Sequence, residues 1–124
     1  MIIGVGIDIC ETGRVSAMLK RRPGIATKLF VDDEISLIDD KRRSDESIAA
    51  RFAAKEALAK ALGAPSGLRW SDVNVAVDES GQPSFVIRGT VASRAEQLGI
   101  TKIHLSISHD AGIAAAFVVC ERES

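Results

Sequence analysis

The feature that most constrains the fold is a run of strong helix formers, DESIAARFAAKEALAKALG, over residues 45–63. Residues of high helix propensity fill this run, and Gly63 stands where a helix would end. At about 100° per residue, several side chains lie within about 60° of Glu56. They are Ala49, Phe52, Ala53, Ala59, Lys60 and Gly63. This stripe of mostly small residues separates Glu56 from Arg51 and Lys55, which we expect to be exposed charges.

The second constraint is an Ile- and Val-rich strand predicted over residues 2–9, which overlaps GVGIDIC at 4–10. Alternate residues of a strand share a face. One face carries Ile3, Val5, Ile7 and Ile9, and the other carries Gly4, Gly6, Asp8 and Cys10. Two glycines leave room for another backbone to come close. If the stripe of the long helix packs on this glycine face, Asp8 and Glu56 converge.

The remaining elements alternate short helices with paired strands. We expect helices over 12–22 (capped by Thr12), 32–40 and 90–99, and strands over 73–77, 84–88, 102–108 and 112–121. The turns fall at 79–83 and 109–111. This order favours an α+β fold in which an antiparallel sheet packs with helices on one side. The length of 124 residues suits a single domain over residues 1–124.

Two carboxylates in a partly dry cleft repel each other, and a hard divalent cation would relieve the repulsion. Mg²⁺ commonly binds one or two carboxylates together with waters and substrate phosphates. Lys60, one turn beyond Glu56, would then lie where a phosphate could meet it. The residues alone leave a plainer interpretation open. Asp8 could end a strand, while Glu56 and Lys60 form an ordinary ion pair along the helix.

Composition and the missing motifs exclude several classes of protein. With a net charge of −1 the chain has no overall basic character that would indicate nucleic-acid binding, and it has no run of 18 apolar residues that would predict a membrane span. No secretory leader precedes the first strand, so we expect a cytoplasmic protein in which Cys10 and Cys120 are reduced. A disulfide between them is the alternative. Dinucleotide-binding, P-loop, serine-hydrolase and zinc patterns are absent.

Three motifs then occur in a telling order: GIDIC followed by Arg14, RFAAKEALAKALG at 51–63, and SISHD at 106–110. Together they resemble the small phosphopantetheinyl transferases of the holo-acyl-carrier-protein synthase family over nearly the whole chain. FVDDE at 30–34 and GQP at 81–83 also fit that pattern. APSG at 64–67 departs from that pattern, since the family often has Thr-Gly after KALG.

The resemblance implies transfer of 4′-phosphopantetheine from coenzyme A to a serine of apo acyl carrier protein, in support of fatty acid biosynthesis. Asp8 and Glu56 then match the Mg²⁺ ligands, and Lys60 matches the lysine beside the pyrophosphate. Arg51, Pro83 and His109 match residues around the nucleotide end of CoA. Phosphoryl transfer is mostly positioning and charge neutralisation, which agrees with this set. The sequence does not choose between Glu56 and a water on the metal as the base for the carrier serine.

The first predicted helix carries Arg14, Met18, Arg21 and Arg22 on one face. Three cations around a methionine suit an acidic amphipathic helix such as an acyl carrier protein presents, and a merely solvated basic face is the alternative. The resemblance also implies a homotrimer whose active sites lie between subunits. A non-catalytic module of the same fold, holding a nucleotide or a carrier protein, is the second functional hypothesis. The intact Asp8, Glu56 and Lys60 favour the transferase.

Overall fold

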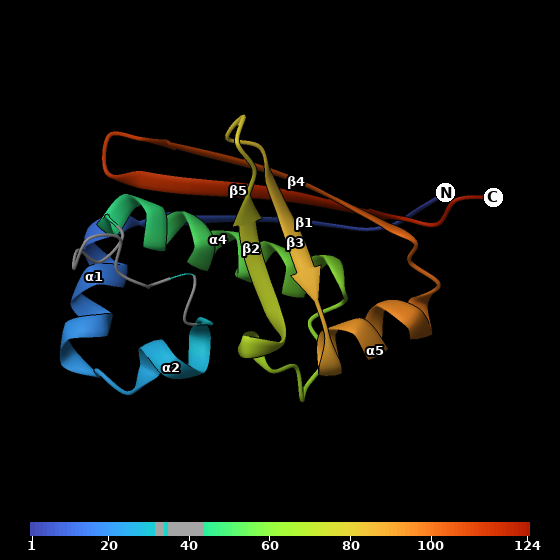
Figure 1. The fold of residues 1–124 in the computed structure, drawn as a ribbon, viewed down its shortest axis with the longest axis horizontal. Helices are drawn as coiled ribbons and strands as arrows, with labels where there is room; N and C mark the ends of the chain where they lie inside the picture. The colour runs from blue at the N-terminus through green and yellow to red at the C-terminus, as the bar shows by residue number, and fades with distance from the viewer. Residues whose placement is uncertain (32–33, 35–43) are drawn as a thin grey trace.

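A three-stranded antiparallel sheet and a long central helix organise the computed structural model, which describes residues 1–31, 34 and 44–124 (Figure 1). In chain order the elements are β1 (Ile2–Glu11), α1 (Thr12–Arg21), α2 (Ile25–Leu29), α4 (Asp45–Ala61), η1 (Trp70–Asp72), β2 (Val73–Val77), β3 (Pro83–Ile87), α5 (Gly89–Leu98), β4 (Lys102–Asp110) and β5 (Ile113–Glu121). The strands pair as β1-β5-β4 in one sheet and as β2-β3 in a second. The predicted α+β fold is confirmed.

Helix α4 packs directly on β1, as the glycine spacing predicts. A Cβ added to Gly4 would overlap the carbonyl oxygen of Ala61, and one added to Gly6 would overlap that of Ala57. No side chain other than hydrogen therefore fits between strand and helix at these two positions. The contact fixes which residues of α4 lie beside Asp8, because Ala57 directly follows Glu56 in the helix.

The core surrounds α4, which is buried on most of its circumference. Its buried residues are Ile48, Ala49, Ala50, Arg51, Ala53, Ala54, Lys55, Ala57, Leu58 and Ala61. Residues from α1, β2, α5 and β5 complete one continuous apolar cluster with them. Alanine keeps the helix slim enough for neighbouring backbones to approach it, so α4 serves as the axis of the molecule.

Several boundaries differ from the sequence predictions for local reasons. Thr12 is not the cap of α1; it is the first helical residue, and Glu11 occupies the N-cap without a side-chain bond. Strand β1 accordingly runs on to Glu11. Helix α2 follows Pro23-Gly24 and was not predicted. The helix predicted over 32–40 lies outside the described residues except for Glu34.

The turn between β4 and β5 is tighter than predicted and consists of Ala111 and Gly112 alone. Both have positive φ, 51° and 76°, as a two-residue hairpin turn requires. His109 is therefore a strand residue, opposite Ala114 in the β4–β5 register.

The other face of the β1-β5-β4 sheet is apolar and open within this chain. Ile7 and Phe117, which are register partners, are 55% and 46% exposed. Val5, Ile9 and Ile113 are also exposed on it. We call these five residues the outer sheet face. No helix within residues 1–31, 34 and 44–124 combines the length and the apolar character that crossing a membrane requires.

Candidate active site

A cleft of about 520 Å³ lies between the end of β1, helix α1 and the middle of α4. Its lining residues are Asp8, Ile9, Cys10, Glu11, Arg14, Val15, Ala17, Met18, Arg21, Phe52, Glu56 and Lys60. The structure thus brings together both predicted metal ligands, the predicted phosphate-binding lysine and three of the four predicted docking residues. Arg22, the C-cap of α1, is exposed and does not line the cleft.

Lys60 ties the strand to the helix at the floor of the cleft. Its Nζ donates to the carbonyl oxygen of Ile7 at 2.9 Å and to Oδ1 of Asp8 at 3.3 Å. The Lys60 side chain is 52% exposed, whereas that of Asp8 is 16% exposed. The ammonium group therefore neutralises a half-buried carboxylate and still faces solvent, where an anionic group could reach it.

Glu56 is half-buried, and its surroundings disfavour the ionised form of its carboxyl group. Burial raises the pKa of Glu56 above its usual value, and the nearby charge of Asp8 raises it further, while Lys60 opposes the shift. Burial, with Asp8 and Glu56, likewise raises the pKa of the Cys10 thiol. The charges of Asp8 and Glu56 thus act on each other, in agreement with the predicted convergence of the two carboxylates.

The donor set fits a hard cation that brings its own waters. Among the described residues, no group of three or more His, Cys, Asp or Glu side chains is placed to enclose a metal. Asp8 and Glu56 supply two carboxylates, which is the number that Mg²⁺ commonly takes from a protein when phosphates and waters complete its shell. Burial raises the pKa of Glu56 and the charge of Asp8 adds to that shift, and a cation held by the two carboxylates would oppose it.

Cys10 and Phe52 belong to the cleft wall, and neither was predicted as a site residue. Cys10 shares the face of Asp8 and donates a weak bond from Sγ to the carbonyl oxygen of Ala49 at 3.5 Å. Phe52, one turn before Glu56, stacks on Trp70 with ring centroids 5.9 Å apart and planes inclined by 12°. The period of the strand and the spacing of the helix had already placed both residues beside the carboxylates. Only the contact with Trp70 required the structure.

The other predicted CoA residues lie in a different hollow. Arg51, Pro83 and His109 line a space of about 270 Å³ together with residues of β2 and the start of α4. No described residue lines both this hollow and the cleft. Arg51 and Glu56 are five residues apart, about 140° around the helix, so they point into different grooves. One chain therefore presents the predicted CoA residues in two places.

The prediction that Arg51 and Lys55 are exposed charges was wrong. Arg51 is 6% exposed and Lys55 is 2% exposed. Arg51 donates from Nη1 to the hydroxyl of Ser47, one turn earlier, and Lys55 pairs with Glu34. Burial lowers the pKa of Lys55, and Glu34 opposes that shift. Because α4 is covered on most sides, charged side chains on it are buried wherever a polar partner meets them.

Comparison with known proteins agrees with this geometry. The family model described as the 4′-phosphopantetheinyl transferase superfamily matches residues 4–118. The chain belongs to this superfamily. The match spans the cleft, the hollow and every predicted site residue. It also confirms the resemblance on which the site predictions rested.

Individual members of the superfamily are similar over their whole length. A holo-(acyl-carrier-protein) synthase of Streptomyces griseus is 59% identical over 121 residues, which cover 98% of this chain and 99% of that protein. The crystal structure of a holo-ACP synthase from Plasmodium yoelii has a TM-score of 0.88 at 28% identity and covers 100% of this chain and 98% of its own. A Helicobacter pylori synthase, solved in complex with coenzyme A, has a TM-score of 0.79 at 32% identity, with 94% and 99% covered.

Proposed function

We propose that this chain is a holo-acyl-carrier-protein synthase in which Asp8 and Glu56 hold Mg²⁺ and Lys60 receives the pyrophosphate of CoA. The activity is transfer of 4′-phosphopantetheine from CoA to a serine of apo acyl carrier protein, with release of adenosine 3′,5′-bisphosphate. It follows from membership of the superfamily and from the full-length similarity to synthases. The observation that supports the site is the single cleft that Asp8, Glu56 and Lys60 share.

Each of the three side chains has a distinct role in this proposal. A bound cation would neutralise charge on the phosphate groups. Lys60, already donating to Asp8, turns its exposed ammonium to the phosphate that leaves with the nucleotide. Glu56 lies in the cleft beside Lys60, where it would accept the proton of the carrier serine either directly or through a water on the cation.

The carrier protein docks on α1 in this proposal. Arg14 and Arg21 are exposed, and they line the mouth of the same cleft beside the half-buried Met18. An acidic amphipathic helix laid there would bring its serine to the cleft without crossing another element. Arg22 lies outside the cleft, so its part is limited to long-range attraction.

A homotrimer with shared sites explains the two separate hollows and the outer sheet face. Arg51, Pro83 and His109 were predicted at the nucleotide end of CoA and Lys60 at its pyrophosphate, yet within one chain they line different hollows. A head-to-tail ring sets one surface of each subunit against another surface of its neighbour, so hollow and cleft could complete one site. The outer sheet face supplies an apolar area for such an assembly to cover.

The deciding experiment is a variant panel assayed by mass spectrometry. Apo carrier protein, CoA, Mg²⁺ and the enzyme are incubated, and the phosphopantetheine mass increment on the carrier is followed. Asp8→Ala and Glu56→Ala should each lose most of the transfer while remaining folded, and Mg²⁺ should raise their melting temperature less than that of the wild type. Near-normal transfer by Asp8→Ala at ordinary Mg²⁺ would disprove the metal site. No increment with the wild type would favour the non-catalytic binding module.

A further inference from the structure

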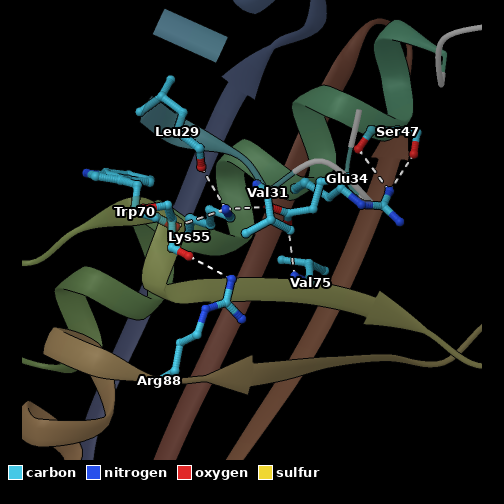
Figure 2. A network of polar contacts seen from close by, with 10 residues as sticks. Leu29, Val31, Glu34, Ser47, Lys55, Trp70, Val75 and Arg88 are labelled. Carbon is cyan, nitrogen blue, oxygen red and sulfur yellow. Dashed lines mark hydrogen bonds and ion pairs between the residues drawn. The ribbon is translucent and has the colours of Figure 1, made fainter. Parts of the chain in front are cut away.

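The ammonium group of Lys55 is enclosed by acceptors from three separate parts of the chain (Figure 2). Its Nζ donates to the carbonyl oxygen of Leu29 at 2.6 Å, to Oε1 of Glu34 at 2.5 Å and to the carbonyl oxygen of Trp70 at 3.1 Å. The ring of Phe30 lies 5.2 Å from the same nitrogen. Three donors meet three acceptors, so this buried cation is fully satisfied.

Glu34 extends the network to a fourth element. Its Oε1 also accepts the backbone N–H of Val31 at 3.0 Å, and its Oε2 accepts that of Val75 in β2 at 2.9 Å. Figure 2 shows the carboxylate lying between Lys55 and Val75. The Lys55 and Glu34 side chains are both 0% exposed. One ion pair thus fixes the end of α2, the start of η1 and strand β2 to the middle of α4.

The network reaches the cleft through one aromatic stack. Lys55 holds the backbone of Trp70, and the ring of Trp70 stacks on Phe52, which lines the cleft. Lys55 itself is not one of the residues that line the cleft. It immediately precedes Glu56, so any rotation of α4 that breaks the Lys55 contacts also turns the Glu56 carboxylate away from Asp8.

We propose that Lys55 and Glu34 are positioning residues for the metal site, holding α4 at the rotation that points Glu56 at Asp8 and holding Phe52 as the cleft wall. This inference rests on the proposed Mg²⁺ site at Asp8 and Glu56. The Gly4–Ala61 and Gly6–Ala57 contacts fix how close α4 lies to β1. The Lys55 network, on another side of the helix, fixes how it is turned.

Stability alone does not require such a pair. A buried ion pair replaced by apolar or neutral groups of similar volume often costs little, whereas removal of one partner leaves an uncompensated charge. The pair can therefore be dismantled while the fold is kept. Glu34→Gln alone keeps the shape of the side chain but leaves the buried Lys55 charge uncompensated, so it is the harsher change. The double variant Lys55→Met with Glu34→Gln removes both charges and is the milder one. Leu58→Ala is the matched control, since Leu58 is 2% exposed on the same helix and belongs to no polar network.

The test measures Mg²⁺ binding by calorimetry and by the Mg²⁺-induced rise in melting temperature, alongside transfer. Residues that hydrogen-bond a metal ligand typically alter affinity by about 10- to 100-fold. Lys55 and Glu34 act one step further out, through the position of α4, so both network variants should need up to about 10-fold more Mg²⁺ for half-saturation. Leu58→Ala should melt lower but bind Mg²⁺ as the wild type does. Trp70 is the only tryptophan of the chain, so a changed emission spectrum in the network variants reports the loosened stack directly.

Two results would overturn the inference. One is a folded double variant, or a folded Glu34→Gln variant, with wild-type Mg²⁺ half-saturation. The other is an equal shift in Leu58→Ala, which would make the effect one of general destabilisation. Asp8→Ala in the same titration separates this failure from failure of the site itself. If Asp8→Ala retains the wild-type Mg²⁺ response, both proposals fall; if it loses that response while the network variants keep it, only the positioning role falls.

Discussion

The closest approach of strand and helix, at Gly6, gives the sharpest test of how the site is built. Gly6→Ala would put a methyl group into the carbonyl oxygen of Ala57, the residue after Glu56. Real Cβ atoms essentially never approach a heavy atom within 3.0 Å, and the obstacle here is backbone that no rotamer change can move aside. Strand and helix would have to separate by more than about 1 Å, and the two carboxylates would separate with them.

The size of the effect follows from two opposing terms. Overpacking a well-packed contact costs about 1–3 kcal/mol. Replacing glycine by alanine restricts the unfolded chain and returns about 0.4–1 kcal/mol. The net loss is about 1–2 kcal/mol, and at about 4 °C per kcal/mol for a chain of this length the melting temperature should fall by about 4–8 °C. The Mg²⁺ concentration for half-maximal transfer should also rise, because a metal site tolerates only about 0.5 Å of displacement.

The assay is thermal melting at one protein concentration, with and without Mg²⁺, followed by a Mg²⁺ titration of transfer. Gly13→Ala is the control, since an added Cβ at Gly13 meets nothing within 4 Å and lies in helix α1. It should leave the melting temperature unchanged or raise it, because alanine is the better helix former. If Gly6→Ala melts at or above the wild-type temperature and keeps the wild-type Mg²⁺ requirement, the close contact does not set the site.

Four further outcomes are expected. Arg14→Glu should raise the KM for the carrier protein and leave that for CoA nearly unchanged; equal effects on both would make α1 a structural face. Lys60→Ala should lower kcat more than it raises the KM for CoA, and an unchanged kcat would remove Lys60 from phosphate stabilisation. Phe117→Glu should yield smaller assemblies in sedimentation, and an unaltered assembly would show that the outer sheet face is not an interface. Because the pKa of Glu56 lies above its ordinary value of 4.5, the ionised Glu56 carboxylate lowers the stability of the fold at neutral pH, and this loss of stability disappears as pH falls toward 4.5. The Mg²⁺-induced rise in melting temperature should shrink over the same pH range. Glu56→Gln should abolish the pH dependence that comes from this carboxylate.

The part of the site that sequence could predict depends on local periods. Asp8 follows Gly4 and Gly6 at the two-residue period of a strand, and Glu56 precedes Lys60 by one helical turn. The sequence alone therefore predicts which face of the strand and which side of the helix each residue lies on. The close helix–strand contact was predicted because glycine has no side chain beyond hydrogen, so Gly4 and Gly6 let another backbone approach the strand. These predictions needed no knowledge of distant segments, and the structure agrees with them.

The errors arose where a distant partner decides the outcome. We predicted that Lys55 faces solvent because charged side chains usually do. Inside the protein, however, its ammonium group donates to Glu34 and to the carbonyl oxygen of Trp70. An alanine-rich helix has little contrast between apolar and polar sides. The positions of its residues around the helix axis therefore could not predict that nearly every side of α4 is covered. Helix α2 is five residues long, below the length at which a periodic pattern is detectable. The β4–β5 turn was misjudged because Ala111 occupies a position that usually takes Asn, Asp or Gly.

The division of the predicted CoA residues between the cleft and the Arg51–Pro83–His109 hollow has a genetic consequence if sites are shared. An Asp8→Ala subunit damages only the cleft that it contributes, and a His109→Ala subunit damages only its hollow. In a ring assembled at random from equal amounts of the two, about one site in four pairs an intact cleft with an intact hollow. Two alleles that are each null would then complement one another in the same cell, whereas two null alleles that both alter the cleft would not.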